Sequence, residues 1–456
     1  MTSEVFYLND RAASMAESLQ FKAVKVFRDA GLGELFSPGD WVGIKIHFGE
    51  YGITTNLRPQ MVKSIADEIK RLGGKPVVVD CTTILFGDHT SRATATDMRK
   101  TGARHGLTEE ALDCPIWICD GEYGFDDVKV EVPSGVFLKH SRMGKQLLDL
   151  GAMIAVTHFK GHPLGVFGGA LKNIGIGCGS KRGKLLTHVM NHPTYGVKQW
   201  SLNQQAAQAA AAGPHPNALD RLMTNCPFDA FSYENDALAM DHGKCTECAA
   251  CMGPGMFSGM MVPPAELMLM FAATIPDAFS AYVHAIGKDK VGYVSYGVDI
   301  TPWCDCVEYS DRALVPNLGV FASRDPVAID MACLEMAESL AAMPGSKADE
   351  LGFGEPGTER FTNCSGMAQV SQWVAINSAI YNGLGTSEYE LVTSEVPDET
   401  EFYLPPYTPE NPWGLVHREA FRALDWRVEP YSYDNLRMSF IEMSMKPHGM
   451  AAEREL

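Results

Sequence analysis

One long stretch of the sequence contains no negative charge. Neither Asp nor Glu occurs between Leu150 and Leu219, although the 456-residue chain has 56 acidic and 38 basic residues and a formal net charge of −18. The acidic excess argues against nucleic acid or an anionic membrane surface as a partner, because either would need a broad basic face. A segment kept free of acids in such a protein indicates that an anion is held there.

Several common sequence signals are also missing. The sequence has no run of about 18 apolar residues and no basic-then-apolar leader, so neither a transmembrane helix nor a secretory signal is predicted. We therefore expect a cytoplasmic protein. The patterns G-x-x-x-x-G-K-[ST], G-x-G-x-x-G after a strand and G-x-S-x-G are absent. Their absence argues against P-loop, Rossmann and serine-hydrolase chemistry.

Twelve cysteines are many for a protein in a reducing compartment, where they are thiols or metal ligands more often than disulfides. Three of them form the run Cys245-Thr-Glu-Cys248-Ala-Ala-Cys251. This C-x-x-C-x-x-C spacing is typical of one corner of an iron–sulfur cubane, and in bacterial ferredoxins it continues to a fourth cysteine followed by proline. Here Gly255 stands at that fourth position. The sequence therefore predicts one [4Fe–4S] cluster with an unidentified fourth ligand.

Three other cysteines are candidates for that ligand: Cys226, Cys304 and Cys306. If none of them binds, one iron is left open and could act as a Lewis acid, as metals do in hydration and elimination chemistry. A cluster with four cysteine ligands would only carry electrons. Zinc bound by the three cysteines with His242 or a distant cysteine, or no metal at all, are the alternatives. Cys304 and Cys306 could also form a site of their own for a second metal ion.

The acid-free stretch contains a glycine-rich, cationic segment, residues 157–188. Glycine-rich loops present backbone N–H groups to anions, and Lys and Arg bind phosphate, carboxylate or sulfonate. The candidate anion-binding residues are Lys172, Lys181, Arg182, Lys184 and, from an earlier loop, Arg58. The candidate catalytic residues are His158, His162, His47 and Lys160, of which the histidines could act as acids, bases or metal ligands. The plainer interpretation is that the glycines allow close packing and the lysines are solvated.

Strands and helices alternate along most of the chain. Apolar or alternating runs predict strands at 41–48, 76–80, 115–120, 128–132, 152–157, 291–298 and 318–322. Helical spacing predicts helices at 10–30, 59–72, 93–105, 141–150, 263–286 and 325–343. This order predicts an α/β fold with a mainly parallel sheet covered by helices. His47, Asp80 and His158 come at the ends of strands, where ligands gather in such sheets, so we expect them to face one cleft.

Four segments are expected along the chain. Residues 1–225 form an α/β domain with the cationic site, 226–262 a small ferredoxin-like insertion, and 263–394 the continuation of the α/β domain. Residues 395–456, which are rich in Pro and Glu, form a C-terminal extension.

Several motifs resemble the DUF362 family of iron–sulfur-associated proteins over residues 1–345. They are Lys45-Ile-His-Phe-Gly-Glu50, Asp80-Cys-Thr-Thr83, His158-Phe-Lys-Gly-His162, Val166-Phe-Gly-Gly-Ala-Leu-Lys-Asn173, the segment 175–184, Cys304-Asp-Cys306 and Ser323-Arg-Asp-Pro-Val-Ala-Ile-Asp330. The resemblance implies a ferredoxin-like [4Fe–4S] segment inside or beside the domain, from which this chain departs at Gly255. It leaves the reaction open.

Three functions fit these observations. The leading hypothesis is an iron–sulfur oxidoreductase or electron-transfer component that acts near a small anionic substrate or cofactor and has a redox partner protein. The abundance of Cys and Met points to an anaerobic setting. The second hypothesis is a non-redox enzyme, hydratase- or isomerase-like, that uses an open cluster iron or a His-bound metal. The third is a metallocofactor-binding or maturation protein that docks through residues 395–456.

Overall fold

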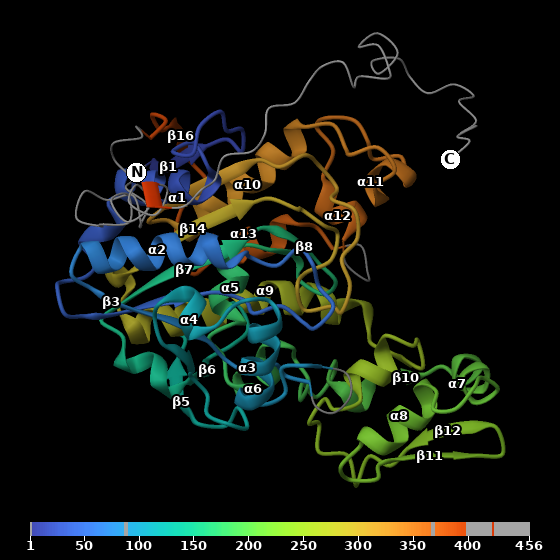
Figure 1. Cartoon of the computed structure of the whole chain (residues 1–456). Helices are drawn as coiled ribbons and strands as arrows, with labels where there is room; N and C mark the ends of the chain where they lie inside the picture. Colours follow the sequence, from blue (N-terminus) through green and yellow to red (C-terminus); the bar gives the residue numbers. More distant parts are fainter. Residues whose placement is uncertain (1, 86–89, 366–369, 398–421, 424–456) are drawn as a thin grey trace, which may run out of the picture. The chain divides into compact units, whose positions relative to one another are not determined.

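Figure 1 shows the computed structural model, which describes residues 2–85, 90–365, 370–397 and 422–423. The chain divides into two units, Met1–Glu399 and Thr400–Leu456. The elements below belong to the first unit. Apart from 395–397 and 422–423, the expected C-terminal extension at 395–456 lies outside the described residues.

The core of the first unit is an eight-stranded sheet with the order β16-β1-β15-β14-β7-β2-β3-β4 (Figure 1). Its strands are β1 (Ser3–Leu8), β2 (Trp41–Lys45), β3 (Lys75–Asp80), β4 (Ile116–Ile118), β7 (Ala152–His158), β14 (Val291–Gly297), β15 (Gly319–Ser323) and β16 (Tyr389–Thr393). The strands from β14 to β4 are all parallel, whereas β15 runs antiparallel to both of its neighbours. The predicted α/β fold with a mostly parallel sheet is confirmed.

Helices cover both faces of the sheet. The longer ones are α1 (Leu19–Asp29), α2 (Pro59–Arg71), α3 (Ala95–Arg104), α9 (Ala265–Ile286), α10 (Pro326–Ser339) and α13 (Trp373–Tyr381). Side chains on β14 show the two faces, because successive residues of a strand point to opposite sides. The Tyr296 hydroxyl donates to the Met61 carbonyl of α2 at 3.1 Å, whereas the Tyr293 ring stacks on Phe279 of α9 at 6.1 Å.

Shorter elements fill the connections. They are α4 (Glu109–Leu112), α5 (Ala170–Gly175), α6 (Lys181–Thr187), α11 (Lys347–Glu350), α12 (Arg360–Cys364) and the small hairpin β8 (Lys160–His162) with β9 (Val166–Gly168). Asp325 caps α10 by accepting hydrogen bonds from the N–H groups of Val327 and Ala328 at 2.8 and 2.9 Å. Asp330 of the same helix caps α5 by accepting a hydrogen bond from the Ala170 N–H.

The predicted helix at 141–150 is wrong. Residues His140–Gly144 form strand β6, which pairs antiparallel with β5 (Asp127–Glu131), and only Lys145–Asp149 turns into a short 3₁₀ helix. The leucines at 147, 148 and 150 imitate helical spacing, but Ser141 and Met143 are buried on alternate positions of a strand. Pairing with a neighbouring strand decides the local structure here, and a single-segment pattern does not contain that information.

The cysteine-containing segment forms small elements of its own. They are β10 (Ser201–Leu202), α7 (Gln204–Ala211), α8 (Ala218–Asn225), β11 (Phe231–Glu234), β12 (Ala237–Met240), a π-helical turn (Met252–Met256) and β13 (Met261–Val262). Strand β10 pairs with β13, so Ser201 lies opposite Val262 and the segment leaves and rejoins the α/β body at one place.

Helix α9 is the one described helix that is long and apolar enough to cross a membrane. However, 83% of its apolar window is buried inside this protein, where the helix packs against α5 and α13. Asp277 in its middle accepts hydrogen bonds from the N–H groups of Val136, Phe137 and Leu138. The helix therefore acts as a core helix of the fold.

Candidate functional site

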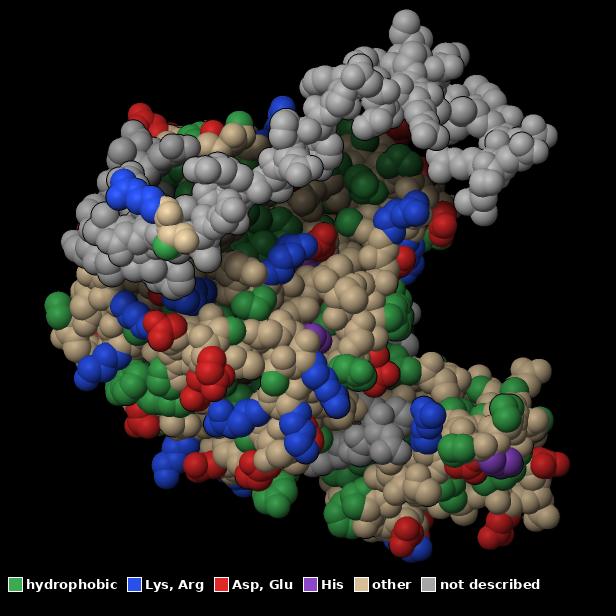
Figure 2. All heavy atoms as spheres, in the orientation of Figure 1, with side chains coloured by type: hydrophobic (Ala, Val, Ile, Leu, Met, Phe, Trp, Pro, Cys, Tyr) green, Lys and Arg blue, Asp and Glu red, His purple; other side chains and the backbone are tan. Residues whose placement is uncertain are grey.

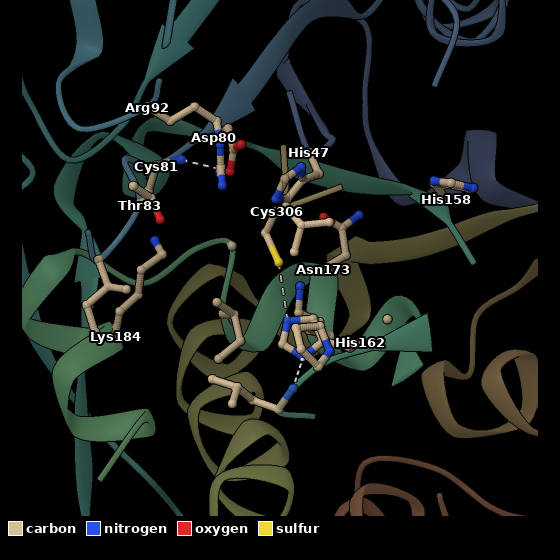
Figure 3. Close-up of a pocket in the computed structure, with 18 of the residues that line it drawn as sticks. His47, Asp80, Cys81, Thr83, Arg92, His158, His162, Asn173, Lys184 and Cys306 are labelled. Atoms are coloured by element: carbon tan, nitrogen blue, oxygen red, sulfur yellow. Dashed lines mark hydrogen bonds between the residues drawn. The ribbon is translucent and has the colours of Figure 1, made fainter. Parts of the chain in front are cut away.

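A cavity lies at the carboxyl ends of the parallel strands (Figure 3). His47 follows β2, Asp80 ends β3 and His158 ends β7, and all three line the cavity. The expectation that these strand ends face one cleft therefore agrees with the structure. The internal volume is about 110 Å³, which suits a few water molecules or a small ligand.

Asp305 organises the positive charge on one side of the cavity. Its carboxylate lies 2.9 Å from His158 Nδ1 and 2.9 Å from Lys160 Nζ, and all three side chains are buried. Although burial raises the pKa of Asp305, the charges of His158 and Lys160 outweigh it and hold that pKa well below its usual range. Lys160 also donates to the His158 carbonyl at 2.7 Å.

Both ring nitrogens of His158 are occupied. Nε2 lies 2.8 Å from the Val298 carbonyl and Nδ1 faces the Asp305 carboxylate, and both partners only accept hydrogen bonds. The geometry is that of an imidazolium donating on both sides. His158 therefore contributes fixed charge and position, and it has no free nitrogen for a ligand.

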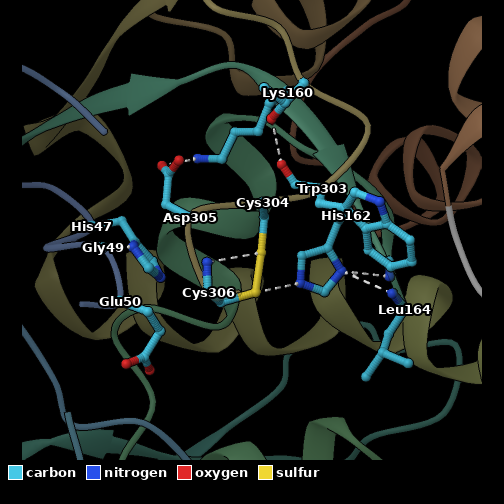
Figure 4. The surroundings of a disulfide bond; sticks show 12 residues. His47, Gly49, Glu50, Lys160, His162, Leu164, Trp303, Cys304, Asp305 and Cys306 are labelled. Carbon is cyan, nitrogen blue, oxygen red and sulfur yellow. Dashed lines mark hydrogen bonds and ion pairs between the residues drawn. A yellow bond between two sulfur atoms is a disulfide. The ribbon is translucent and has the colours of Figure 1, made fainter. Parts of the chain in front are cut away.

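His162 lies beside a disulfide between Cys304 and Cys306 (Figure 4). His162 Nδ1 accepts hydrogen bonds from the N–H groups of Leu164 and Gly165 at 3.1 and 2.7 Å. The ring proton is therefore on Nε2, which lies 3.6 Å from Cys306 Sγ. Burial lowers the pKa of His162 well below its usual range, so the ring is neutral.

Two further histidines face the cavity with one nitrogen free of hydrogen bonds to other described residues. His47 Nδ1 accepts from Gly49 N–H at 2.9 Å, and His188 Nδ1 donates to the Lys184 carbonyl at 2.7 Å. Burial lowers the pKa of His188 to about 3 and that of His47 well below its usual range, where Arg92 lowers it further. Both rings are therefore neutral and can exchange hydrogen bonds with a ligand.

Most of the cationic groups around the cavity already have partners. Lys45 pairs with Asp80 at 2.9 Å, and Arg92 pairs with Glu50 at 3.0 Å. Lys184 donates to the Gly179 carbonyl. These contacts hold the walls of the cavity together.

Lys172 of α5 differs from the other lysines of the cavity. It lines the cavity and is only 9% exposed, and no described residue pairs with its ammonium group by a hydrogen bond or an ion pair. Burial lowers the pKa of Lys172 well below its usual range, and neighbouring Lys160 lowers it further. An anion in the cavity would supply the missing partner.

Asp330 fixes the helix that carries Lys172. Its carboxylate accepts hydrogen bonds from the N–H groups of Ala170 and Leu171 at 2.7 and 3.0 Å. A Cβ on Gly169 would lie 2.3 Å from the Asp330 carboxylate, so only glycine fits at that position. The cap and the glycine together set the position from which Lys172 enters the cavity.

The remaining predicted anion ligands lie elsewhere. Arg182 pairs with Asp127 at 2.9 Å on the surface, and Arg58 pairs with Asp299 at 2.6 Å; neither lines the cavity. Lys181 donates to the Thr83 carbonyl behind the cavity wall, and burial lowers its pKa to about 7. Apart from Arg182, the Lys and Arg side chains of segment 157–188 are buried. On the face drawn in Figure 2, basic and acidic side chains are interspersed.

The structure brings Cys226 to the cysteine run. Cys226, Cys245, Cys248 and Cys251 line one small pocket, together with apolar residues such as Phe228 and Phe231. Burial raises the pKa of the Cys251 thiol, and neighbouring Cys248 and Cys245 raise it further. Four soft sulfur donors that line one pocket suit zinc or an iron–sulfur cluster, and binding either one would displace the thiol protons. Cys304 and Cys306 are bonded to each other in the other site.

The cysteine loop has an unusual backbone. Glu247 and Ala249, one on each side of Cys248, both have φ of 61°, a left-handed conformation that is uncommon for residues other than glycine. Such conformations collect at ligand clamps, where the surrounding structure holds them. A cysteine at position 255 would require Met261 to move, because a Cβ on Gly255 would lie 2.6 Å from Met261 Sδ and 2.8 Å from its Cγ.

Two residues adjacent in sequence line the two different sites, the cysteine pocket and the cationic cavity. Cys251 lines the cysteine pocket, and the next residue, Met252, lines the cationic cavity together with Phe257. The π-helical turn Met252–Met256 thus forms part of the boundary between them.

One further group could bind a metal ion. Donor atoms of His162, Cys304 and Cys306 lie within 4.8 Å of one another. Both sulfurs would have to be reduced, and the proton on His162 Nε2 would have to move to Nδ1, which would then lose its hydrogen bonds from Leu164 and Gly165. A Cys/His metal site in the cavity is therefore available only in the reduced protein.

Several residues of the cavity were missed in the sequence. Asp305 stands between Cys304 and Cys306, which the sequence suggested as metal ligands. Arg92 lies in a loop that contains no motif. Lys45 begins one of the motifs that carry the family resemblance and Asn173 ends another, and Asn173 donates to the Lys45 carbonyl at 3.1 Å. His188 ends the cationic segment, and its place there is the one signal in the sequence that points to it.

The family model described as "Domain of unknown function (DUF362)" matches residues 42–335, more than half of the chain. The chain belongs to the DUF362 family. No curated protein matches it. Among solved structures, this DUF362 protein is similar to the lactate racemase apoprotein from Thermoanaerobacterium thermosaccharolyticum. The sequence identity is 11% and the TM-score 0.33, over 75% of this chain and 59% of that one. The chain therefore spans less than two thirds of that protein's length.

Proposed function

We propose that this protein is a cytoplasmic iron–sulfur redox protein that acts on a small anionic ligand. In this proposal Cys226, Cys245, Cys248 and Cys251 hold a [4Fe–4S] cluster, which would supply one electron at a time. The observation that carries the proposal is that the fourth cysteine lies in the same pocket as the other three. A cluster with four cysteine ligands would disfavour the version of the hydratase-like alternative that uses an open iron, and leaves the version with a His-bound metal open.

Because Cys251 and Met252 are adjacent in sequence, a cluster in the cysteine pocket would lie close to a ligand in the cationic cavity. This supports electron transfer between them. A ligand in the cavity would touch Met252 or Phe257, on the wall that borders the cysteine loop. Lys172 would pair with its negative charge, while the neutral rings of His47 and His188 offer hydrogen bonds or accept a proton. We further propose a protein redox partner, because Cys226, Cys245 and Cys248 are only half-buried and electrons could enter there. An oxygen-sensitive cluster of this kind fits an anaerobic setting.

Metal analysis of protein purified without oxygen tests the cluster. We expect about four irons and four sulfides per chain and an EPR signal after reduction. Cys226→Ser should lose the iron, whereas Cys306→Ser, which changes an equally half-buried cysteine outside the pocket, should keep it. A protein that stays colourless and iron-free after reconstitution would overturn the proposal. Loss of iron in Cys306→Ser with retention in Cys226→Ser would also overturn it.

His162, Cys304 and Cys306 favour a second candidate function, the binding of a metal or metallocofactor in the cavity. Titration with Co²⁺ of a reduced variant in which Cys226, Cys245, Cys248 and Cys251 are all replaced by serine should then give thiolate-to-metal absorption, since that variant lacks the thiols of the other pocket. Adding Cys306→Ser should abolish the absorption. An unchanged spectrum would remove this candidate.

A further inference from the structure

We propose that the Cys304–Cys306 pair is a thiol–disulfide exchange centre for a small thiol that carries an anionic group. The proposal requires only the cavity, so it does not depend on the cluster. The disulfide lies at the cavity wall, where Cys306 faces the open space and Cys304 is fully buried (Figure 4). An incoming thiolate therefore meets Cys306 Sγ first, and Cys304 is the leaving group.

Each sulfur has an N–H donor directed at it. The Cys306 backbone N–H donates to Cys304 Sγ at 3.2 Å, and His162 Nε2–H points at Cys306 Sγ from 3.6 Å. The two backbone donors on Nδ1 of His162 fix the ring so that Nε2 keeps its proton and its direction. A thiolate formed on either cysteine would thus find a hydrogen bond already in place, which favours it as a leaving group.

The charges around the pair favour a negatively charged thiol. The only acid between the two cysteines, Asp305, is turned toward His158 and Lys160, whose charges neutralise it. Lys172 lines the same cavity as Cys306 and has no partner among the described residues. A carboxylate or sulfonate on the thiol would pair with Lys172 while its sulfur approaches Cys306. A neutral thiol would gain no such contact.

The exchange balances in two steps. A first thiolate attacks Cys306 Sγ, the bond between Cys306 and Cys304 breaks, and Cys304 leaves as a thiolate. A second thiol attacks the sulfur of the bound thiol, releasing an external disulfide and the Cys306 thiolate. The two protons of the incoming thiols end on the two cysteines. The net change is the oxidation of two thiols and the reduction of one disulfide, and it is reversible.

The test compares mercaptoacetate, which is anionic, with 2-mercaptoethanol, which is neutral. The oxidised full-length protein is exposed briefly to each thiol and alkylated, and the peptide containing the pair is analysed by mass spectrometry. Rates are divided by those of the urea-unfolded chain, which has no cavity. We expect the thiol on Cys306 and the alkyl group on Cys304, and a preference for mercaptoacetate of about tenfold or more at low salt.

Lys172→Met should lose the preference for mercaptoacetate. High salt should reduce the preference in the unmodified protein, and this measurement serves as the test if the variant does not fold. The cluster-free Cys226→Ser protein should react like the unmodified protein, so failure of the proposed cluster leaves this result intact. Three outcomes would overturn the proposal: an adduct on Cys304, no reaction before unfolding, or equal normalised rates for the two thiols.

Discussion

His158 and Asp305 form a buried pair across 147 residues of sequence, with His158 Nδ1 2.9 Å from the Asp305 carboxylate. Lys160 joins the same carboxylate, so one acid holds two cations at the rim of the cavity. The pair ties the end of β7 to the loop after β14 that carries the disulfide. A residue that the sequence suggested as an acid or base is therefore, in the structure, part of the frame that positions the cavity wall.

Replacing Asp305 should strongly destabilise the protein. Asp305→Asn leaves the charges of His158 and Lys160 buried without a counter-charge, and breaking a buried pair in this way costs about 3–5 kcal/mol of unfolding free energy. Urea unfolding of the two proteins measures the difference. Asp289→Asn, which changes an exposed aspartate, should stay within about 0.5 kcal/mol. Equal effects of the two substitutions would show that the pair contributes nothing.

The same pair predicts a pH dependence. Because the pKa of Asp305 is held well below its usual range in the folded protein, its contribution is complete above about pH 4, the pKa of an unfolded aspartate. The contribution is lost as the pH falls through the lower folded pKa. Unfolding measured between about pH 2 and 6 should show this acid-induced loss of stability in the natural protein. The loss should be smaller in Asp305→Asn, and an unchanged slope would contradict the assignment.

The elements that carry strong local signals were predictable. Helix α2 begins at Pro59, as predicted, and ends at Arg71 before the two glycines that stop it. The edge strand β16 and its neighbour β1 were missed, because pairing with the sheet rather than their own sequence forms them. The strand-end residues His47, Asp80 and His158 follow from the parallel topology, and the structure does place them around one cavity.

The partners of the cations were not predictable. Segment 157–188 has no acids of its own, and the sequence suggested that its lysines meet a ligand. In the structure Asp305 and Asp127 arrive from distant segments and pair with Lys160 and Arg182. Only the three-dimensional structure shows that Lys160 and Arg182 are paired, whereas Lys172 has no partner among the described residues. In the same way, the sequence offered three candidates for a fourth ligand beside Cys245, Cys248 and Cys251. In the fold, Cys226 lines the same pocket as these three cysteines.

A cysteine restored at the ferredoxin position should not replace Cys226. In Cys226→Ser, adding Gly255→Cys brings a Cβ within 2.6 Å of Met261 Sδ, and such overpacking costs about 1–3 kcal/mol. We expect no recovery of iron and a lower melting temperature. Adding Met261→Ala relieves the contact and serves as the control for stability. Full iron in the double variant Cys226→Ser, Gly255→Cys would contradict the proposed choice of ligand.

A methyl group on Gly169, which lines the cavity, should disturb the anion site by displacing the Asp330 carboxylate. Gly169→Ala places a Cβ 2.3 Å from the Asp330 carboxylate, which must then release the N-terminus of α5. Loss of a helix cap costs about 1 kcal/mol and shifts Lys172. The affinity for sulfate and the free energy of unfolding should both decrease. Gly354→Ala, where the nearest atom is 3.7 Å away, is the matched control and should change neither.

Anion binding should take up a proton, and Lys172 should be the residue that accepts it. Burial and Lys160 lower the pKa of Lys172 in the cavity without an anion, which favours the neutral amine over the ammonium form. An anion beside it raises that pKa and restores the charge. Affinity should therefore fall as the pH rises. Titration calorimetry with sulfate, which does not titrate in this range, should show uptake of up to about one proton when buffers of different ionisation enthalpy are compared.

Two substitutions in the same segment separate this role from general positive charge. Lys172→Met should abolish the proton uptake and weaken sulfate binding by about 1.5–3 kcal/mol, the contribution of a hydrogen bond to a charged group. Arg182→Met removes the same formal charge, but Arg182 pairs with Asp127 outside the cavity, so both affinity and proton uptake should stay unchanged. If the two variants weaken binding equally, sulfate responds to the net charge of the segment and Lys172 has no special position. If Lys172→Met binds sulfate as the natural protein does, the anion lies elsewhere.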